Sequence, residues 1–435
     1  MNFKIHRGTK EIGGSCVEIW TTETRIVVDF GIPLVNADKS PFDTKQLSAL
    51  SQQELIDKGI LPNIQSLYQP NTKTALILSH AHQDHYRLIN YLHDTCPVFL
   101  GEATHKLIEI TNIFNRNKDW EIAYPNYFVS GKSFWIGDIE IIPYLMDHSA
   151  FDAYAFMIKA NGKSLFYSGD FRIHGRKTKA FDWFSRNVDK NIDYLLLEGT
   201  AINRSDKKFL TETEIEKEFI QTFKQSQGIN LIYTSGQNID RLVSIYRACK
   251  QTSKIMVIDF YIATILKNMA LLGAKIPYPT SNFSEIKVFF PYRLSKMITN
   301  QGNEKLMYQF KNYKITKKEI DNGFKDIVMI VRPSMLKDLE HLENLNHGTF
   351  TYSMWSGYKK EDTTKDFISF LKAKGMYENE LHTSGHADRE GLKLMVNVLK
   401  PQKIIPIHTF DRDEYEKIFA DTKVEILNDL EEIKL

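Results

Sequence analysis

The chain has 435 residues, of which 42% are hydrophobic and 25% are charged, and its formal net charge is +2. This is ordinary globular composition, with room for two or three domains. No apolar run reaches the length of a membrane span, and the first residues lack the apolar stretch of a signal peptide. Cys16, Cys96 and Cys249 are far apart and odd in number, so we expect no disulfide, a cytoplasmic location and no membrane contact.

Short strands dominate the first 200 residues. Runs of Val, Ile and aromatic residues bounded by turn residues favour strands, and the spacing of Leu107, Ile110 and Phe114 indicates a helix over 101–114. The expected strands cover 16–20, 25–29, 74–79, 98–100, 139–142, 153–158, 164–167 and 194–197. Residues that carry chemistry stand just past several of these strands, where sites form on α/β sheets: Asp29, His80, Asp170 and Glu198.

The pattern changes after residue 199 to an alternation of strands and helices. The segment Thr211-Glu-Thr-Glu214 is a capping box that opens a helix. The elements that follow alternate in the manner of a parallel sheet. They are strands at 229–233, 254–259, 327–331 and 350–353, helices at 239–249 and 262–272, and then helices at 363–373 and 388–399 and a strand at 403–407. Because His408 follows the last strand, we expect one domain that is interrupted by another.

Positive charge is concentrated in one part of the chain. Between Lys250 and Lys337 there are 15 Lys and Arg residues against 6 Asp and Glu residues. Such a run is a solvated face in many proteins, but it is also the electrostatic footprint of a polyanion partner.

The run His80-Ala-His82-Gln-Asp84-His85 carries three imidazoles and a carboxylate within six residues, directly behind the strand at 74–79. Imidazole and carboxylate are ligands of zinc, and less often of manganese or iron. These side chains can converge only if the backbone turns sharply between the strand and a helix. His80 and His82 would then bind one metal ion, and Asp84 and His85 a second. The alternative, a histidine-rich surface loop, is the weaker interpretation of so dense a pattern.

Three later residues could complete a two-metal site. His148 lies between two expected strands, Asp170 follows the strand at 164–167 and a glycine, and His408 follows the strand at 403–407. Each residue alone would be read as a buried histidine, a turn residue or a helix cap. Together with the turn at 80–85, they supply the donors that a dinuclear centre needs.

In this order, the motif at 80–85 followed by His148, Asp170 and His408 resembles the metallo-β-lactamase-fold hydrolases. Asp29, in Val-Val-Asp-Phe-Gly, resembles the first motif of that superfamily, which implies that it orients the ligand turn without binding metal. The resemblance implies an α/β fold: a metallo-β-lactamase αββα sandwich with an inserted parallel-sheet α/β domain. We expect 1–199 and 357–435 to form the first and second parts of the metallo-β-lactamase domain, and 200–356 to form the insert.

Further segments resemble the β-CASP subgroup of nucleases. Its motifs A, B and C are similar to Leu-Leu-Leu-Glu198-Gly-Thr, Thr-Ser-Gly-His386 and Ile-Pro-Ile-His408. The segment 234–241 resembles the part of the insert near which nucleic acid passes, and the amides that follow motif B are suited to hold a phosphate. The resemblance therefore implies substrate contacts by Ser235, Asn238, Arg241, Ser384 and Gly385. Within this subgroup the chain resembles ribonuclease J, but only 27 residues follow His408, so we expect the C-terminal domain of that group to be missing.

The resemblance also implies a mechanism. His80, His82 and His148 would hold one zinc ion, Asp84, His85 and His408 would hold the other, and Asp170 would bridge them, with Mn²⁺ as an alternative metal. Two such ions provide hydroxide near neutral pH for in-line attack on phosphorus. Asp84 would accept a proton, His386 would protonate the leaving oxygen, and Glu198 would fix the tautomer of His386.

The expected function is zinc-dependent hydrolysis of single-stranded RNA, by endonuclease or 5′ exonuclease action. Members of the family often form dimers, so the resemblance also implies a homodimer. DNA is the alternative substrate, because attack by hydroxide needs no 2′-OH. A small-molecule hydrolase of the same fold and a catalytically silent binding subunit are further alternatives. The insert with its basic segment argues against a small-molecule hydrolase. The filled ligand positions argue against a catalytically silent subunit.

Overall fold

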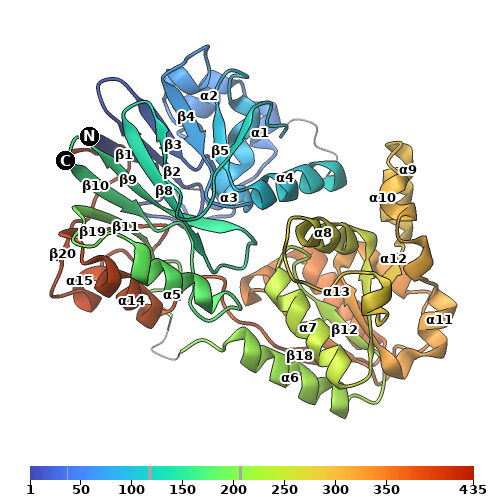
Figure 1. Cartoon of the computed structure of the whole chain (residues 1–435). Helices are drawn as coiled ribbons and strands as arrows, with labels where there is room; N and C mark the ends of the chain where they lie inside the picture. The colour runs from blue at the N-terminus through green and yellow to red at the C-terminus, as the bar shows by residue number, and fades with distance from the viewer. Residues whose placement is uncertain (37, 116–119, 205–207) are drawn as a thin grey trace. The chain divides into compact units, whose positions relative to one another are not determined.

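Two compact units make up the computed structural model, which describes residues 1–36, 38–115, 120–204 and 208–435 (Figure 1). Unit 1 comprises Met1–Phe209 and Gly385–Leu435, and unit 2 comprises Leu210–Ser384. Unit 2 is thus inserted into unit 1 along the chain. Among the described residues, no helix combines the length and the apolarity needed to cross a membrane.

Two seven-stranded sheets build unit 1. In order across the first sheet the strands are β21 (Glu432–Lys434), β1 (Asn2–Arg7), β2 (Cys16–Trp20), β3 (Arg25–Val28), β4 (Thr74–Ile77), β5 (Val98–Leu100) and β6 (Pro125–Tyr127). Across the second sheet they are β20 (Lys423–Val424), β19 (Lys403–Ile407), β11 (Tyr194–Glu198), β10 (Lys163–Tyr167), β9 (Ala153–Ala160), β8 (Ile139–Met146) and β7 (Phe134–Ile136). One hydrophobic core joins the sheets, with Phe3 and Ile26 from the first sheet and Phe156 and Leu196 from the second.

Helices cover the outer faces of both sheets. The helices of unit 1 are α1 (Gln46–Ala49), α2 (Gln52–Asp57), α3 (Gln83–Tyr86), α4 (Glu102–Asn115), α5 (Thr178–Asn187), α14 (Arg389–Leu399) and α15 (Glu414–Ile418). In Figure 1, α1 to α4 lie beside the first sheet, and α5, α14 and α15 lie beside the second. Phe184 of α5 and Leu392 of α14 pack with Phe166 and Leu195 in a second core on the outer face of the second sheet. These layers confirm the predicted αββα sandwich.

Unit 2 contains a third seven-stranded sheet, in which every pairing is parallel. Its strands are, in order, β15 (Lys314–Ile315), β14 (Ile286–Phe289), β13 (Ile255–Asp259), β16 (Ile327–Val331), β12 (Asn230–Tyr233), β17 (Thr349–Tyr352) and β18 (Tyr377–Glu380). Its helices are α6 (Glu212–Gln225), α7 (Ile239–Gln251), α8 (Phe260–Leu271), α9 (Tyr292–Asn300), α10 (Lys305–Tyr308), α11 (Lys317–Asn322), α12 (Leu336–Leu339) and α13 (Asp362–Ala373). The parallel sheet confirms the predicted architecture of the insert.

The bounds of the units differ from the expected domain bounds. Unit 2 begins at Leu210, where we expected residue 200, and ends at Ser384, where we expected residue 356. The larger difference has a clear cause, because β18 pairs in parallel with β17, and α13 contributes Phe367 and Leu371 to the core of unit 2. The sequence does not reveal β18, because it is a polar edge strand with three of its four residues exposed.

The carboxyl ends of several strands in unit 1 position the polar residues singled out above. In the first sheet β3 and β4 are parallel neighbours with Val28 opposite Ile77, so the chain leaves both strands at the same edge. In the second sheet β10, β11 and β19 are parallel neighbours. β8 runs in the same direction as β10, because both strands are antiparallel to β9. Segments that follow these strands therefore gather at one edge of each sheet.

Candidate metal centre

The segment 80–85 is a sharp turn between β4 and the single-turn helix α3. His82 has extended backbone angles (φ −89°, ψ 142°) and directly precedes α3, so the chain changes direction within the motif. The loop after β3 supports this turn, because Phe30 N donates to His85 O at 2.7 Å. Gly31 is required here, since a Cβ atom at this position would overlap the carbonyl of Asp84. The predicted strand–turn–helix geometry is therefore present.

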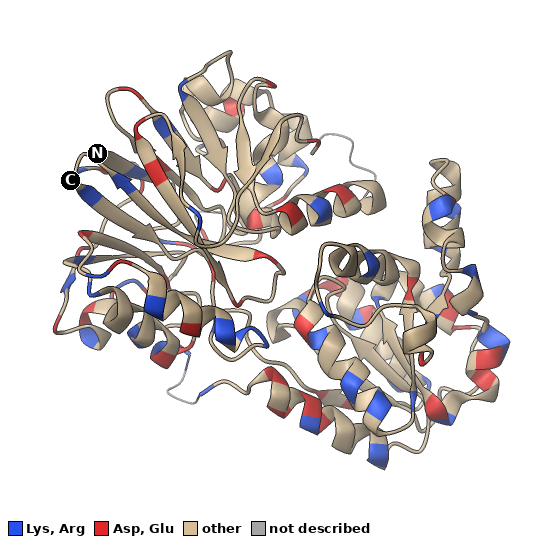
Figure 2. Cartoon of the chain, viewed as in Figure 1, with Lys and Arg blue, Asp and Glu red and all other residues tan. Residues whose placement is uncertain are grey.

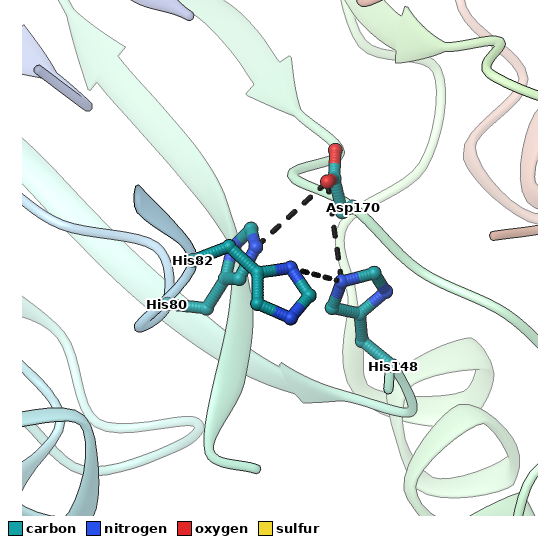
Figure 3. A group of neighbouring side chains, drawn as sticks. All are labelled: His80, His82, His148 and Asp170. Atoms are coloured by element: carbon teal, nitrogen blue, oxygen red, sulfur yellow. Dashed lines mark hydrogen bonds and ion pairs between the residues drawn. The ribbon is translucent and has the colours of Figure 1, made fainter. Parts of the chain in front are cut away.

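Four of the predicted ligands form a first group at this turn: His80, His82, His148 and Asp170 (Figure 3). Nδ1 of His82 lies 3.2 Å from Nε2 of His148. Oδ2 of Asp170 lies 3.8 Å from Nε2 of His80 and 4.0 Å from Nε2 of His148. One donor atom of each residue thus faces a common point.

Asp84, His85 and His408 form a second group. Oδ2 of Asp84 lies 3.8 Å from Nε2 of His85 and 3.4 Å from Nε2 of His408. Asp170 adjoins this group as well, because its Oδ2 is 3.1 Å from Nε2 of His85 and its Oδ1 is 3.6 Å from Nδ1 of His408. The Asp170 carboxylate therefore lies where it can be shared between the two groups.

Each of four histidines has its Nδ1 atom close to a polar group of the protein. The distances are 2.9 Å from His80 to Ser79 Oγ, 2.8 Å from His85 to Asp29 Oδ2, 2.6 Å from His148 to the Gly385 carbonyl and 2.8 Å from His408 to Thr200 Oγ1. A carbonyl or carboxylate only accepts, so His148 and His85 donate through Nδ1 and leave Nε2 for the centre. This arrangement is typical of histidines that bind metal through Nε2. Asp29 contacts His85 in this way, as expected of an orienting residue.

Burial and charge favour a metal ion at both groups. Burial holds the pKa of His80 and His148 well below the ordinary value and lowers the pKa of His82 to about 4, so these rings are neutral ligands. At the second group burial disfavours the charged form of His85, but the carboxylates of Asp170, Asp29 and Asp84 outweigh burial and hold the pKa of His85 well above the ordinary value. This negative charge attracts a cation, and a metal ion that binds here would displace the proton from His85 Nε2.

The residues present fit a metal ion. His80 Nε2 is buried and makes no hydrogen bond to any described residue, although it faces Asp170 and the other donors of the first group. An unpaired nitrogen buried in this way is destabilising unless a cation binds it. The set of five imidazoles, one shared carboxylate and Asp84 has the ligand chemistry of zinc.

His386 and Glu198 lie next to the two groups. His386 Nδ1 is 3.6 Å from Glu198 Oε2 and 3.8 Å from Asp170 Oδ2. Glu198 in turn accepts from Thr200 N at 2.9 Å and from Ala387 N at 3.2 Å, so its carboxylate is fixed. Burial lowers the pKa of His386, but Asp170 and Glu198 outweigh burial and raise it above the ordinary value. With a side chain 19% exposed, His386 is the more accessible member of this pair.

Comparisons with known proteins agree with this geometry. Residues 377–416, which include His386 and His408, match the family model described as "Zn-dependent metallo-hydrolase RNA specificity domain". Ribonuclease J of Mycoplasma genitalium is 21% identical over 92% of this chain and 66% of its own length. Ribonuclease J of Helicobacter pylori is 24% identical over 92% of this chain and 55% of its own length. The chain is a ribonuclease J-like protein of the metallo-β-lactamase/β-CASP type.

The ribonuclease J-like chain spans about half to two thirds of the length of these curated relatives. Its fold also matches a solved structure from end to end. That structure, a protein of unknown function from Enterococcus faecalis, has a TM-score of 0.79 and 20% identity, with 100% of this chain and 99% of the other covered. At this identity the match shows the fold alone.

The structure corrects one predicted substrate contact of the ribonuclease J-like chain. Arg241 is fully buried, and its guanidinium pairs with Glu212 at 3.0 Å and donates to Ser353. Its charge is therefore used inside unit 2, where it joins α7 to α6, and not on a surface that a nucleic acid could reach. The prediction for Arg241 was wrong because the sequence does not show that the arginine meets Glu212 of the preceding helix.

The other predicted contacts have local roles that leave the prediction open. Asn238 is buried and caps α7, because its side chain accepts from Arg241 N at 3.2 Å. Ser235 is half-buried, and its hydroxyl accepts from Gln237 N at 3.2 Å. Ser384 is buried at the end of unit 2, and Gly385 in unit 1 contributes the carbonyl that holds His148. Their contacts with a substrate remain a prediction.

The supporting residues Ser79, Tyr167 and Thr200 were not singled out from the sequence. Asp29 Oδ1 accepts from Ser79 N at 2.7 Å, and its Oδ2 accepts from Ser79 Oγ at 2.8 Å and from Tyr167 OH at 2.6 Å. Thr200 holds His408 across 208 positions of the chain. The position of Thr200 two residues after Glu198 was the only available signal.

Proposed function

We propose that the chain is a zinc-dependent nuclease that hydrolyses phosphodiester bonds of single-stranded RNA, by internal cleavage, by 5′ exonuclease action or by both. The observation that carries the proposal is the pair of largely buried ligand groups with Asp170 next to both. The names of the relatives and the matched RNA specificity domain favour RNA over a small-molecule substrate. We assign the catalytic domain to unit 1 and the β-CASP insert to unit 2.

In this proposal His80, His82 and His148 hold one zinc ion, Asp84, His85 and His408 hold a second, and Asp170 serves both. Bound zinc makes water available as a nucleophile near neutral pH and offsets negative charge on phosphate oxygens. The protein's part is to hold the donors. The four Nδ1 contacts described above fix the ring orientations before a substrate arrives.

Proton transfer is assigned to two accessible side chains at the centre. The Asp84 side chain is 15% exposed, against 2% for Asp170, and it is the ligand carboxylate that a water molecule can reach. His386 donates a proton to the leaving oxygen, because an imidazole at the edge of the centre can both reach solvent and reload. Glu198 acts through His386, which it holds from a fixed position.

The test is cleavage of labelled single-stranded RNA and DNA of the same sequence, with and without a chelator. We expect the zinc-loaded protein to cut RNA, the chelated protein to be inactive, and His80→Ala to abolish cutting. His341→Ala changes an exposed histidine outside the centre and serves as the matched control, with wild-type activity expected. Failure of the zinc-loaded protein to cut either polymer would refute the proposal, and cutting of DNA alone would replace RNA by DNA as the substrate.

A second substrate pair separates the two modes of cleavage. RNA with a 5′-phosphate and RNA with a 5′-hydroxyl are compared at equal length, with the label at the 3′ end. A stepwise ladder that depends on the 5′-phosphate indicates exonuclease action, whereas internal fragments from both substrates indicate endonuclease action. A chromogenic β-lactam and a thioester complete the series, because turnover of either without RNA cleavage would favour a small-molecule hydrolase.

A further inference from the structure

In one segment of unit 2 nearly all of the charged residues are positive. Between residues 287 and 318 there are eight Lys and Arg residues and one acidic residue, Glu304. This segment runs from β14 through α9, α10 and β15 to the start of α11. The helix α6 of the same unit has mixed charges instead, with four Glu and two Lys residues. Figure 2 shows the same contrast, with blue bands along the α9–α10 projection and red and blue bands side by side on α6.

Most of these basic side chains are exposed and carry unneutralised charge. Lys317 pairs with Asp338 at 3.1 Å. The exposed members make no ion pair with any residue in the described part of the chain: Arg293, Lys296, Lys305, Lys311, Lys314 and Lys318. Exposed positive charges that outnumber the acidic residues of their segment create a local potential that attracts a polyanion.

A contact between elements adds a lysine of α8 to this segment. Lys267 of α8 donates to Gln309 at 2.6 Å and lies 5.8 Å from the ring centre of Phe310, which places it beside α10. Lys314 begins β15 three residues after Lys311 and lies 5.1 Å from the ring centre of Phe290. The α10 surface consists of Lys267, Lys305, Tyr308, Lys311 and Lys314.

An aromatic ring lies within this basic surface. Tyr308, at the end of α10, is 58% exposed and stands between Lys305 and Lys311 in the chain. Tyr292 at the start of α9 is 67% exposed. Exposed rings among lysines are the means by which proteins hold single strands, since lysines track the phosphates and a ring stacks on an unpaired base. A duplex does not offer its bases to such a ring.

We propose that the α10 surface is an accessory binding site for single-stranded RNA, with Lys267, Lys305, Lys311 and Lys314 on phosphates and Tyr308 stacked on a base. The inference rests on the proposed function, because the strand held there is the substrate of the nuclease. None of the five residues belongs to the ligand groups or to the proton-transfer pair. The surface contributes affinity for long strands and takes no part in the chemistry.

The test measures binding of a labelled single-stranded RNA of about 30 nucleotides by the chelated full-length chain over a range of salt concentrations. In the triple variant Lys305→Gln/Lys311→Gln/Lys314→Gln, we expect the slope of log Kd against log salt to fall by about 2, because each lost phosphate contact on a single strand is worth about 0.7. Tyr308→Ala should weaken binding by about fivefold or more, as the loss of one stacked base does. The matched control is Lys217→Gln/Lys224→Gln/Lys250→Gln, which removes three exposed charges from α6 and α7 and should retain the wild-type slope.

The outcomes separate this inference from the proposed function. If the zinc-loaded wild type cuts RNA and the triple variant binds with the wild-type slope, the α10 surface is not an RNA site, although the nuclease stands. If both triple variants lose slope equally, the effect is one of net charge and the inference is wrong. Two results together would assign the surface to another polyanion. They are displacement of the labelled single strand by polyglutamate or duplex RNA, and wild-type affinity for the single strand in Tyr308→Ala. Circular dichroism and thermal unfolding check that each variant is folded.

Discussion

Replacing Tyr167 by phenylalanine tests whether the residues behind the metal ligands are part of the centre. Tyr167 is buried, and its hydroxyl donates to Asp29 Oδ2 at 2.6 Å. The same oxygen lies 2.8 Å from His85 Nδ1. The change Tyr167→Phe removes one hydroxyl and keeps the ring, so it tests this contact with little change of shape.

The expected size follows from the surroundings of Asp29. This carboxylate is fully buried, and Ser79 and His85 remain as donors when the Tyr167 hydroxyl is lost. A hydrogen bond to a buried charged group contributes about 1.5–3 kcal/mol, so we expect a loss of unfolding free energy in that range. Zinc affinity should fall on the order of tenfold, at the lower end of what outer partners of ligand histidines contribute.

Urea unfolding of the metal-free protein measures the stability, and zinc titration against a competing chelator measures the affinity. Tyr154→Phe is the matched control, because the Tyr154 hydroxyl donates at 2.8 Å to the carboxylate of Asp152, which holds none of the ligand histidines. The control should lose similar stability and keep its zinc affinity. Equal zinc affinity in the wild type and Tyr167→Phe, or equal losses in both variants, would refute the role given to Tyr167.

Three further predictions concern other parts of the chain. His386→Gln should reduce RNA cleavage by about 100-fold or more while zinc content by mass spectrometry stays at the wild-type value, and a loss of zinc would instead make His386 a ligand. Thr200→Val removes the hydroxyl 2.8 Å from His408 Nδ1 and should weaken the second zinc by about tenfold in the same titration, with the first unaffected. Arg241→Met leaves Glu212 buried without its partner and should cost about 3–5 kcal/mol in urea unfolding. Adding Glu212→Gln should recover part of that loss. If Arg241→Met alone were as stable as the wild type, the buried ion pair would not have the role given to it.

The sequence predicted the ligand turn because its geometry is local. An apolar strand, a dense set of donors and a following helix occupy 74–86 without a break, so the strand–turn–helix geometry follows from neighbouring residues. The strands at 98–100, 327–331 and 403–407 were also predicted with their observed bounds, because they are short apolar runs between turn residues.

Features that depend on pairing between distant segments were not predicted. Thr200 and His408 meet because β11 and β19 are neighbours in a sheet, and nothing near either residue indicates this pairing. The burial of Arg241 depends in the same way on Glu212 of another helix. Polar elements were missed for a different reason, since β18 and the short helices of the basic segment have no clear apolar period.

In the proposed function two zinc ions act together on RNA, and zinc titration of cleavage tests this most directly. Metal-free protein receives zinc in fractions of one equivalent, and initial cleavage of labelled single-stranded RNA is measured beside bound zinc. We expect activity to rise until two zinc ions are bound per chain and then to level off, with no activity in His80→Ala at any point. Two bound zinc ions without cleavage, or full cleavage without bound metal, would contradict hydrolysis by a two-zinc centre.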